Sequence, residues 1–221
     1  MMTTREQPME FDVARHIDAI TREVITGERD GKPTRTVRAT RSFDTDIDDA
    51  WDALTNLERI PRWFSPVSGD LRLGGRYQIE GNAGGAITGC ERPRRFALDW
   101  EYGGEVSWVV VTLELDGQGR TRLELEHIAV VDAKFAGFWD QFGPGAAGVG
   151  WDLSLLGLAE HVENGWDKPP EADTEWPSSD NGKAFIGGSS EGWRAASVAF
   201  GTDADAAHEA AERTAGFYTG G

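Results

Sequence analysis

The sequence of 221 residues contains only one cysteine, Cys90, and is poor in basic residues. A single cysteine excludes an intramolecular disulfide and fits a reducing compartment. Its 22 lysines and arginines are outnumbered by 38 aspartates and glutamates, so the formal net charge is -16, spread along the chain. Because phosphate contacts need a positive face, this balance argues against a nucleic-acid partner.

The sequence also lacks the segments and motifs that mark several other protein classes. No apolar run approaches the roughly 20 residues that cross a bilayer, and the start MMTTREQPMEFD has no signal-peptide core, which predicts a cytoplasmic location. Neither a GxSxG elbow nor a phosphate-binding loop with its lysine is present. His16, His161 and His208 lie far apart without cysteines or HExxH spacing, so we expect no metal and no cofactor.

What the chain does contain is enough apolar material for one compact domain with extensions, including nine tryptophans. The most informative segment spans residues 43–93 and contains DTDIDDAWDALTNLERIPRWF. Thr45 or Asp46 suits the N-cap of a short helix with apolar residues at helical spacing, and Pro61 prevents its continuation. Glycine-punctuated strands follow, which indicates a curved antiparallel sheet.

Alternation and periodicity indicate which later side chains face the interior. Residues 95–102 carry an aromatic face, made of Phe96, Leu98, Trp100 and Tyr102. In residues 121–129, His127 shares a face with Leu123 and Leu125, whereas residues 106–115 are apolar on both faces and leave their inward side open. A long helix from residue 147 onward should lie across the sheet with an apolar stripe at Trp151, Leu155, Leu158, Val162 and Trp166.

The motifs DAWDALTNLERIPRWF, SGDLRLGGRYQIEG, ITGCERPRRFALDWEY and TRLELEH occur in this order. In them the chain resembles the SRPBCC superfamily of START-like proteins, and within it the branch named after homologues of the activator of the heat-shock-protein-90 ATPase. The resemblance covers residues 36–166. It implies an α+β helix-grip fold, in which a curved antiparallel sheet wraps around a long C-terminal helix and the two can hold a small hydrophobic ligand.

Both ends carry additions to the START-like domain, which we place at residues 36–167. Residues 1–35 predict a short helix and one strand of an extra hairpin around Asp30 and Gly31. Residues 168–188 are rich in proline and acidic residues and predict a linker. Residues 189–221 predict a helical hairpin, with helices at 189–200 and 204–217. Because so small a hairpin is marginal alone, it should dock on the domain or, alternatively, on a second subunit or a protein partner.

Ten residues are expected to line or close the space between sheet and helix: Trp63, Phe64, Tyr77, Trp100, Trp108, His127, Trp139, Phe142, Trp151 and Leu155. The alternative is that these side chains simply fill the core. Two residues are candidates for chemistry. His127 could act as a general acid or base, or be a core histidine bonded to its neighbours. Asp152 could pair with an arginine, polarise a ligand, or be a solvated surface charge. A lone thiol such as Cys90 at a strand end is usually a small apolar filler.

We therefore predict no assigned catalytic residue, and a small-molecule-binding protein that holds a hydrophobic ligand between sheet and helix. Two alternatives remain open. The first is an enzyme of the polyketide cyclase or dehydratase type, which the superfamily contains. The second is a co-chaperone-like interaction module that uses the C-terminal hairpin as a docking surface. No motif specifies the ligand itself.

Overall fold

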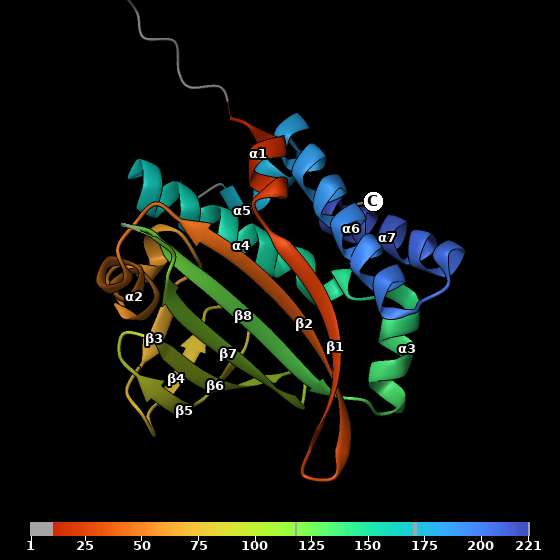
Figure 1. Ribbon diagram of the computed structural model, residues 1–221, viewed down its shortest axis with the longest axis horizontal. Coiled ribbons are helices and arrows are strands. Elements are labelled where there is room, and N and C mark those ends of the chain that lie inside the picture. The colour runs from red at the N-terminus through yellow and green to blue at the C-terminus, as the bar shows by residue number, and fades with distance from the viewer. Residues whose placement is uncertain (1–10, 118, 170–171, 221) are drawn as a thin grey trace, which may run out of the picture.

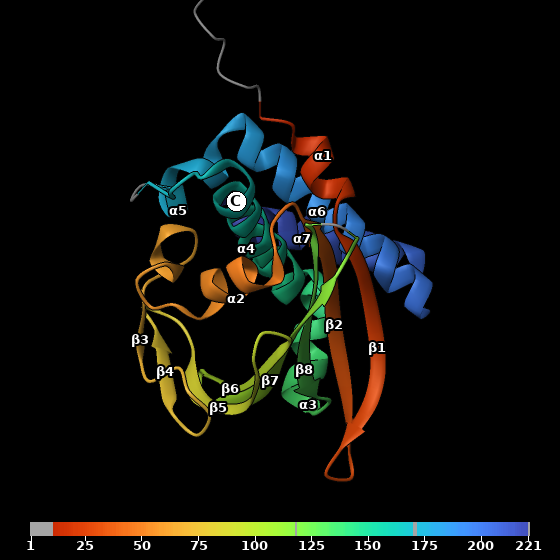
Figure 2. The same cartoon turned by 60° about the vertical axis from the view of Figure 1, so that its left-hand side comes forward.

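A curved antiparallel sheet forms the centre of the fold (Figures 1 and 2). The computed structural model describes residues 11–117, 119–169 and 172–220. Within these ranges the sheet has eight strands in the order β1-β2-β8-β7-β6-β5-β4-β3. The strands are β1 (Thr21–Arg29), β2 (Lys32–Phe43), β3 (Val67–Gly69), β4 (Arg76–Ile79), β5 (Gly84–Glu91), β6 (Arg95–Tyr102), β7 (Glu105–Leu115) and β8 (Thr121–Val130).

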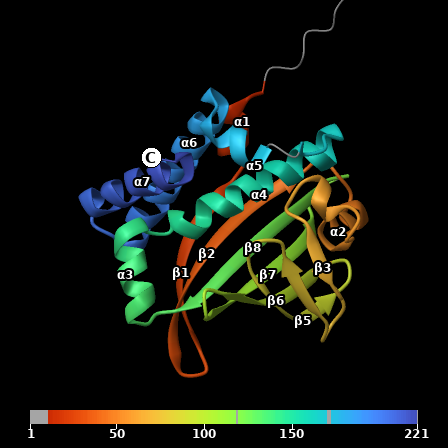
Figure 3. The same ribbon diagram turned by 180° about the vertical axis from the view of Figure 1, so that it is seen from behind.

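Helix α4 crosses the concave side of this sheet, with α2 beside it (Figures 2 and 3). The helices are α1 (Val13–Asp18), α2 (Ile47–Thr55), α3 (Ala133–Phe142), α4 (Gly145–Asn164), α5 (Ala172–Glu175), α6 (Asp180–Phe200) and α7 (Ala204–Thr219). Among the described residues no helix is long and apolar enough to cross a bilayer. The arrangement confirms the predicted α+β helix-grip fold.

Local sequence accounts for the elements that frame the interior. The Asp46 side chain accepts a hydrogen bond from the backbone N–H of Asp49, so Asp46 rather than Thr45 is the N-cap of α2. The β1–β2 hairpin turns at Asp30 and Gly31, whose φ angles of 52° and 74° are those of a tight hairpin turn. Both features confirm predictions made from residue type alone.

The pairing of β7 with β8 shows which of the two apolar faces of β7 points to the interior. Val109, Val111 and Leu113 are buried, and Val111 and Leu113 pair with Leu125 and Leu123 of β8. The even-numbered residues of β7 therefore face away from α4. Trp108 is among them, and the Arg29 guanidinium lies 3.9 Å from the centre of its ring. Trp108 consequently does not reach the space between sheet and helix, contrary to the prediction.

The C-terminal helices dock on their own chain. Helix α6 packs against α1, α4 and β1, and α7 packs against α6 and α3 (Figure 1). Helix α6 begins at Asp180 instead of residue 189, capped by Ser179, so the predicted linker is largely helical. Residues 1–10 of the predicted N-terminal segment, 170 and 171 of the linker and 221 of the hairpin lie outside the described residues.

Close packing of α4 on α6 requires a glycine at position 148. A Cβ atom there would lie only 2.5 Å from Nε1 of Trp193, whose side chain is buried. We expect Gly148→Ala to lower the free energy of unfolding by about 1–3 kcal/mol, because the ring has no room to move. Urea denaturation measures this.

Gly187→Ala in α6 is the matched control. No atom lies within 4 Å of a Cβ at that position, so alanine should stabilise the helix by up to about 1 kcal/mol. Equal stability of the two variants would contradict the proposed packing.

Candidate functional site

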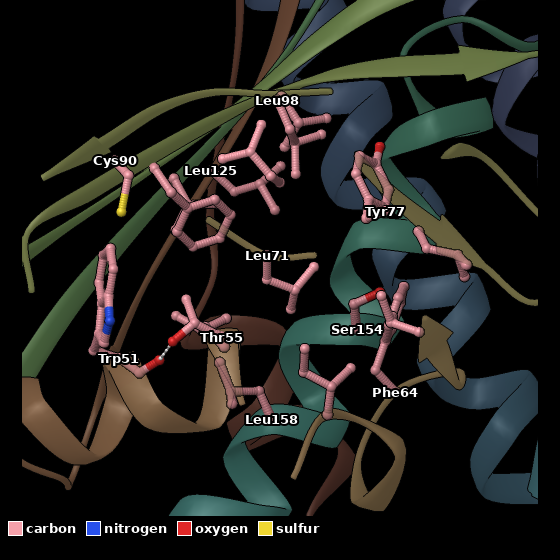
Figure 4. Close-up of a pocket in the computed structure, with 18 of the residues that line it drawn as sticks. Trp51, Thr55, Phe64, Leu71, Tyr77, Cys90, Leu98, Leu125, Ser154 and Leu158 are labelled. Carbon is pink, nitrogen blue, oxygen red and sulfur yellow. Dashed lines mark hydrogen bonds between the residues drawn. The ribbon is translucent and has the colours of Figure 1, made fainter. Parts of the chain in front are cut away.

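An apolar cavity of about 360 Å³ lies between the concave face of the sheet and helices α2 and α4 (Figure 4). Strands β4 to β8 form one wall, and the two helices with the turn after α2 form the other. Figure 4 shows Leu71, Leu98, Leu125 and Leu158 around the same space. Small-molecule sites usually measure about 300–1,000 Å³ and have mostly apolar walls. The cavity therefore has the size and the lining of such a site.

The helical wall follows from local sequence patterns. On α4, Trp151, Ser154, Leu155 and Leu158 recur at steps of three or four residues and face the cavity. After α2, a short 3-10 turn (Ile60–Arg62) directs Trp63 and Phe64 inward, with ring centres 5.5 Å apart. The Trp63 indole N–H donates to the carbonyl oxygen of Ala53 at 2.9 Å, which fixes the ring against α2.

Six of the ten predicted site residues lie together in this lining. They are Trp63, Phe64, Tyr77, Trp100, Trp151 and Leu155. The hydroxyl of Tyr77 donates to the carbonyl oxygen of Asp99 at 2.8 Å, and burial raises the pKa of this tyrosine above its ordinary value. Its hydroxyl is therefore neutral and held by the protein.

Trp139 and Phe142 lie elsewhere, on α3. They border a second cavity of about 230 Å³ between α3, α4, α6 and α7. They were predicted to line or close the space between sheet and helix, with no helix assigned to residues 133–142. Neither ring is in the lining of the cavity between sheet and α4, so the prediction for them was wrong. Trp139 instead stacks on Arg35 of β2, whose guanidinium lies 4.7 Å from the centre of the ring.

His127 sits behind the cavity wall and is bonded at both ring nitrogens. Nδ1 accepts a hydrogen bond from the Trp151 indole N–H at 3.1 Å, and Nε2 lies 2.8 Å from the Ser107 hydroxyl. Because an indole N–H can only donate, Nδ1 is unprotonated and Nε2 carries the hydrogen. Desolvation lowers the pKa of His127 to about 4. The ring is thus neutral near pH 7, and neither nitrogen is free for a substrate.

Asp152 faces the other side of α4, away from the cavity, and is completely buried. One of its oxygens accepts from Arg22 Nε at 2.7 Å, from the Ser189 hydroxyl at 2.5 Å and from the Trp193 indole N–H at 3.1 Å. Burial raises the pKa of Asp152, while Arg22 and the two other donors act in the opposite direction. The carboxylate joins α4 to β1 and α6, so it serves the packing of the extensions.

Four exposed residues of the lining mark the opening of the cavity: Arg72, Leu73, Cys90 and Arg92. The first two lie in the loop between β3 and β4, and the others lie at the end of β5 and in the turn after it. None of the four was predicted to belong to the site. The interpretation of Cys90 as a small apolar filler was wrong, because this thiol is free and exposed.

No group of three or more histidine, cysteine, aspartate or glutamate side chains could hold a metal ion in the part of the chain that the structure describes. The polar side-chain groups of the cavity lining are hydroxyls, indole N–H groups, a thiol and two guanidinium groups. This set can bind and orient a molecule, but it includes no free base.

Comparisons with known proteins place these features in a wider group. The family model described as Activator of Hsp90 ATPase homolog 1-like protein matches residues 44–163, which include α2, β3 to β8 and nearly all of α4. A search of curated proteins finds no match.

Solved structures give a longer match. The crystal structure of CalU16 from Micromonospora echinospora is 30% identical and aligns over 83% of this chain and 99% of its own, with a TM-score of 0.64. Its solution NMR structure is also 30% identical, aligning over 83% of this chain and 97% of its own with a TM-score of 0.67. The crystal structure of DynU16, a protein in the dynemicin biosynthetic locus, is 21% identical, with 60% of this chain and 48% of its own covered and a TM-score of 0.50, so it supports the fold alone.

Proposed function

Since the chain belongs to the family of Activator of Hsp90 ATPase homolog 1-like proteins, whose model matches the part that encloses the cavity, we propose that it binds a small hydrophobic molecule between the sheet and α4. The observation that carries this proposal is the apolar cavity itself. Protein interiors are usually packed without voids much larger than a water molecule. A space of about 360 Å³ with a defined opening is better suited to a ligand than to a filled core.

The catalytic alternative has less support from the geometry. A cyclase or dehydratase of the type considered above needs a proton acceptor facing the substrate. His127 Nδ1 already accepts a hydrogen bond from the Trp151 indole N–H, and Asp152 lies on the far side of α4. Ligand binding needs neither residue as a base.

The interaction-module alternative uses the C-terminal hairpin as a docking surface for another protein. In this chain the apolar side chains of α6 are turned inward, and Phe185, Ile186 and Trp193 are almost completely buried. Helix α6 thus uses its apolar face within its own chain, and on α7 the large apolar side chain left exposed is Phe217. Binding in the cavity is therefore the better supported proposal.

Cys90 provides a direct test, because it is the only cysteine in the sequence and it lies at the opening. We expect aminoanthracene, a small neutral fluorophore, to bind and to slow the alkylation of Cys90 by iodoacetamide. At about 90% occupancy the rate should fall about tenfold, since only free protein reacts. Mass spectrometry of the alkylated chain measures the rate. Unchanged alkylation at saturating probe would argue against the cavity as the binding site.

A matched pair of variants at Ser154 tests whether a larger side chain in the cavity blocks binding. Ser154 presents a small side chain to the cavity from α4, as Figure 4 shows. Ser154→Phe should weaken aminoanthracene binding by at least about tenfold, whereas Ser154→Ala should bind like the wild type. Native mass spectrometry of protein purified from its own host would then identify a retained ligand.

A further inference from the structure

The charged groups that line the cavity are both cationic. In residues 11–117, 119–169 and 172–220 they are Arg72 and Arg92, and no aspartate or glutamate lines the cavity. The charge of the lining is therefore opposite in sign to that of the whole sequence, in which acidic residues outnumber basic ones by 38 to 22. Both arginines are exposed, and both lie at the opening instead of the closed end. The opening therefore differs in charge from the chain as a whole.

Deeper in the cavity, the hydroxyl protons are already used by the protein. Thr55 donates to the carbonyl oxygen of Trp51 at 2.7 Å, and Ser154 donates to that of Gly150 at 2.9 Å. Tyr77 likewise donates to the backbone at 2.8 Å. A polar group placed among these side chains would lose its hydrogen bonds to water and find no free hydroxyl proton in exchange. The deep part of the cavity thus favours an apolar group.

The two arginines at the opening can still engage a ligand. Arg92 has no hydrogen bond or ion pair with any described residue. Arg72 bonds through Nε to Asp70 at 2.6 Å, but its side chain is 82% exposed. Exposed ion pairs of this kind contribute at most about 1 kcal/mol, so a ligand can compete with Asp70. The planar guanidinium binds carboxylates through two parallel hydrogen bonds.

On the basis of the proposed function, we infer that the bound molecule is an amphiphile with an apolar alkyl or aryl body and one anionic group. The body occupies the cavity between sheet and α4. The anionic group, of which a carboxylate is the simplest form, lies at the opening between Arg72 and Arg92. These arginines are then the residues that select acids over neutral molecules of the same shape.

Decanoate and decanol test this inference, because they share a chain length and differ in charge. Each is titrated against the protein carrying aminoanthracene, and displacement gives its affinity. Decanoate should bind the wild type about 10–100-fold more tightly than decanol, the range expected for charged hydrogen bonds. In Arg72→Gln/Arg92→Gln the preference should fall to within about threefold, while the affinity for decanol is retained. Arg120→Gln, an arginine outside the lining, is the control and should keep the wild-type preference.

The outcomes separate this inference from the proposed function. Equal affinity of the wild type for decanoate and decanol would overturn it, as would a preference that survives in the double variant. Binding of aminoanthracene without binding of decanoate also rejects it and leaves the proposed function standing. If none of the three molecules binds, the proposed function fails as well.

Discussion

Replacing Asp152 with alanine is expected to lower the free energy of unfolding by about 3–5 kcal/mol, the cost of removing one partner from a buried ion pair. The change would leave the charge of Arg22 buried without its carboxylate, and it would also remove the acceptor for Ser189 and Trp193. Urea denaturation measures the loss. Hydrogen exchange should localise it to α6 and β1, the elements that the carboxylate connects to α4.

The double variant Arg22→Met/Asp152→Leu distinguishes a lost ion pair from lost packing. Replacing both partners by apolar residues of similar volume removes the buried charge together with its counterion. It should therefore be more stable than Asp152→Ala alone. An Asp152→Ala variant as stable as the wild type would show that this carboxylate does not hold the C-terminal hairpin in place.

Acidification is expected to destabilise the protein through His127. Its pKa is about 4 in the folded protein, against an ordinary value of 6.5. Between these values the unfolded chain binds the proton that the folded state excludes, so stability falls as the pH drops from 6.5 towards 4. The slope is up to about 1.4 kcal/mol per pH unit, or about 3 kcal/mol in total. Urea denaturation from pH 7 to pH 5 follows this slope before most carboxylates are protonated.

His127→Gln should flatten this pH dependence by roughly half. The remainder is expected from His16, whose pKa burial and Arg41 also lower to about 4. His208→Gln, at an exposed position on α7, is the control for loss of a histidine. A His127→Gln variant with the full wild-type slope would show that His127 does not carry the effect.

Much of the fold was predictable because its signals are local. Asp46 caps α2 through its own side chain, and Asp30 and Gly31 turn the first hairpin by their backbone preferences. Strand β7 was not predictable in the same way, because a strand with two apolar faces has no alternation to read. Only its pairing with β8 shows that Val109 and Val111 face inward and Trp108 outward.

The start of α6 was misplaced for a different reason. Gly182, Gly187 and Gly188 weaken the helical signal of this segment, since glycine is a poor helix former. In the fold, Gly182 approaches the Trp176 carbonyl and Gly188 approaches Ile17, contacts that leave no room for a side chain. The tertiary contacts that favour glycine here involve distant residues, and the sequence pattern does not reveal them.

The site was predicted to the extent that helical and strand periodicity determine it. Trp151 and Leu155 follow from the stripe of α4, and Trp100 from alternation in β6. The opening was missed because it joins a loop before β4 to a turn after β5, a proximity that depends on sheet curvature. Arg72 and Arg92 are ordinary surface residues until the sheet bends and places them at the rim of one cavity.

The packing of α6 on α1 and β1 has a consequence for biosynthesis. The ribosome delivers α1 and the first two strands early, whereas residues 180–200 leave the exit tunnel only after the rest of the sheet and α4. Until then the growing polypeptide presents an uncovered hairpin surface, including the neighbourhood of Arg22. The hairpin can therefore reach its final arrangement only once residues 180–200 have left the tunnel, which makes these early strands natural clients for chaperones that bind emerging polypeptides.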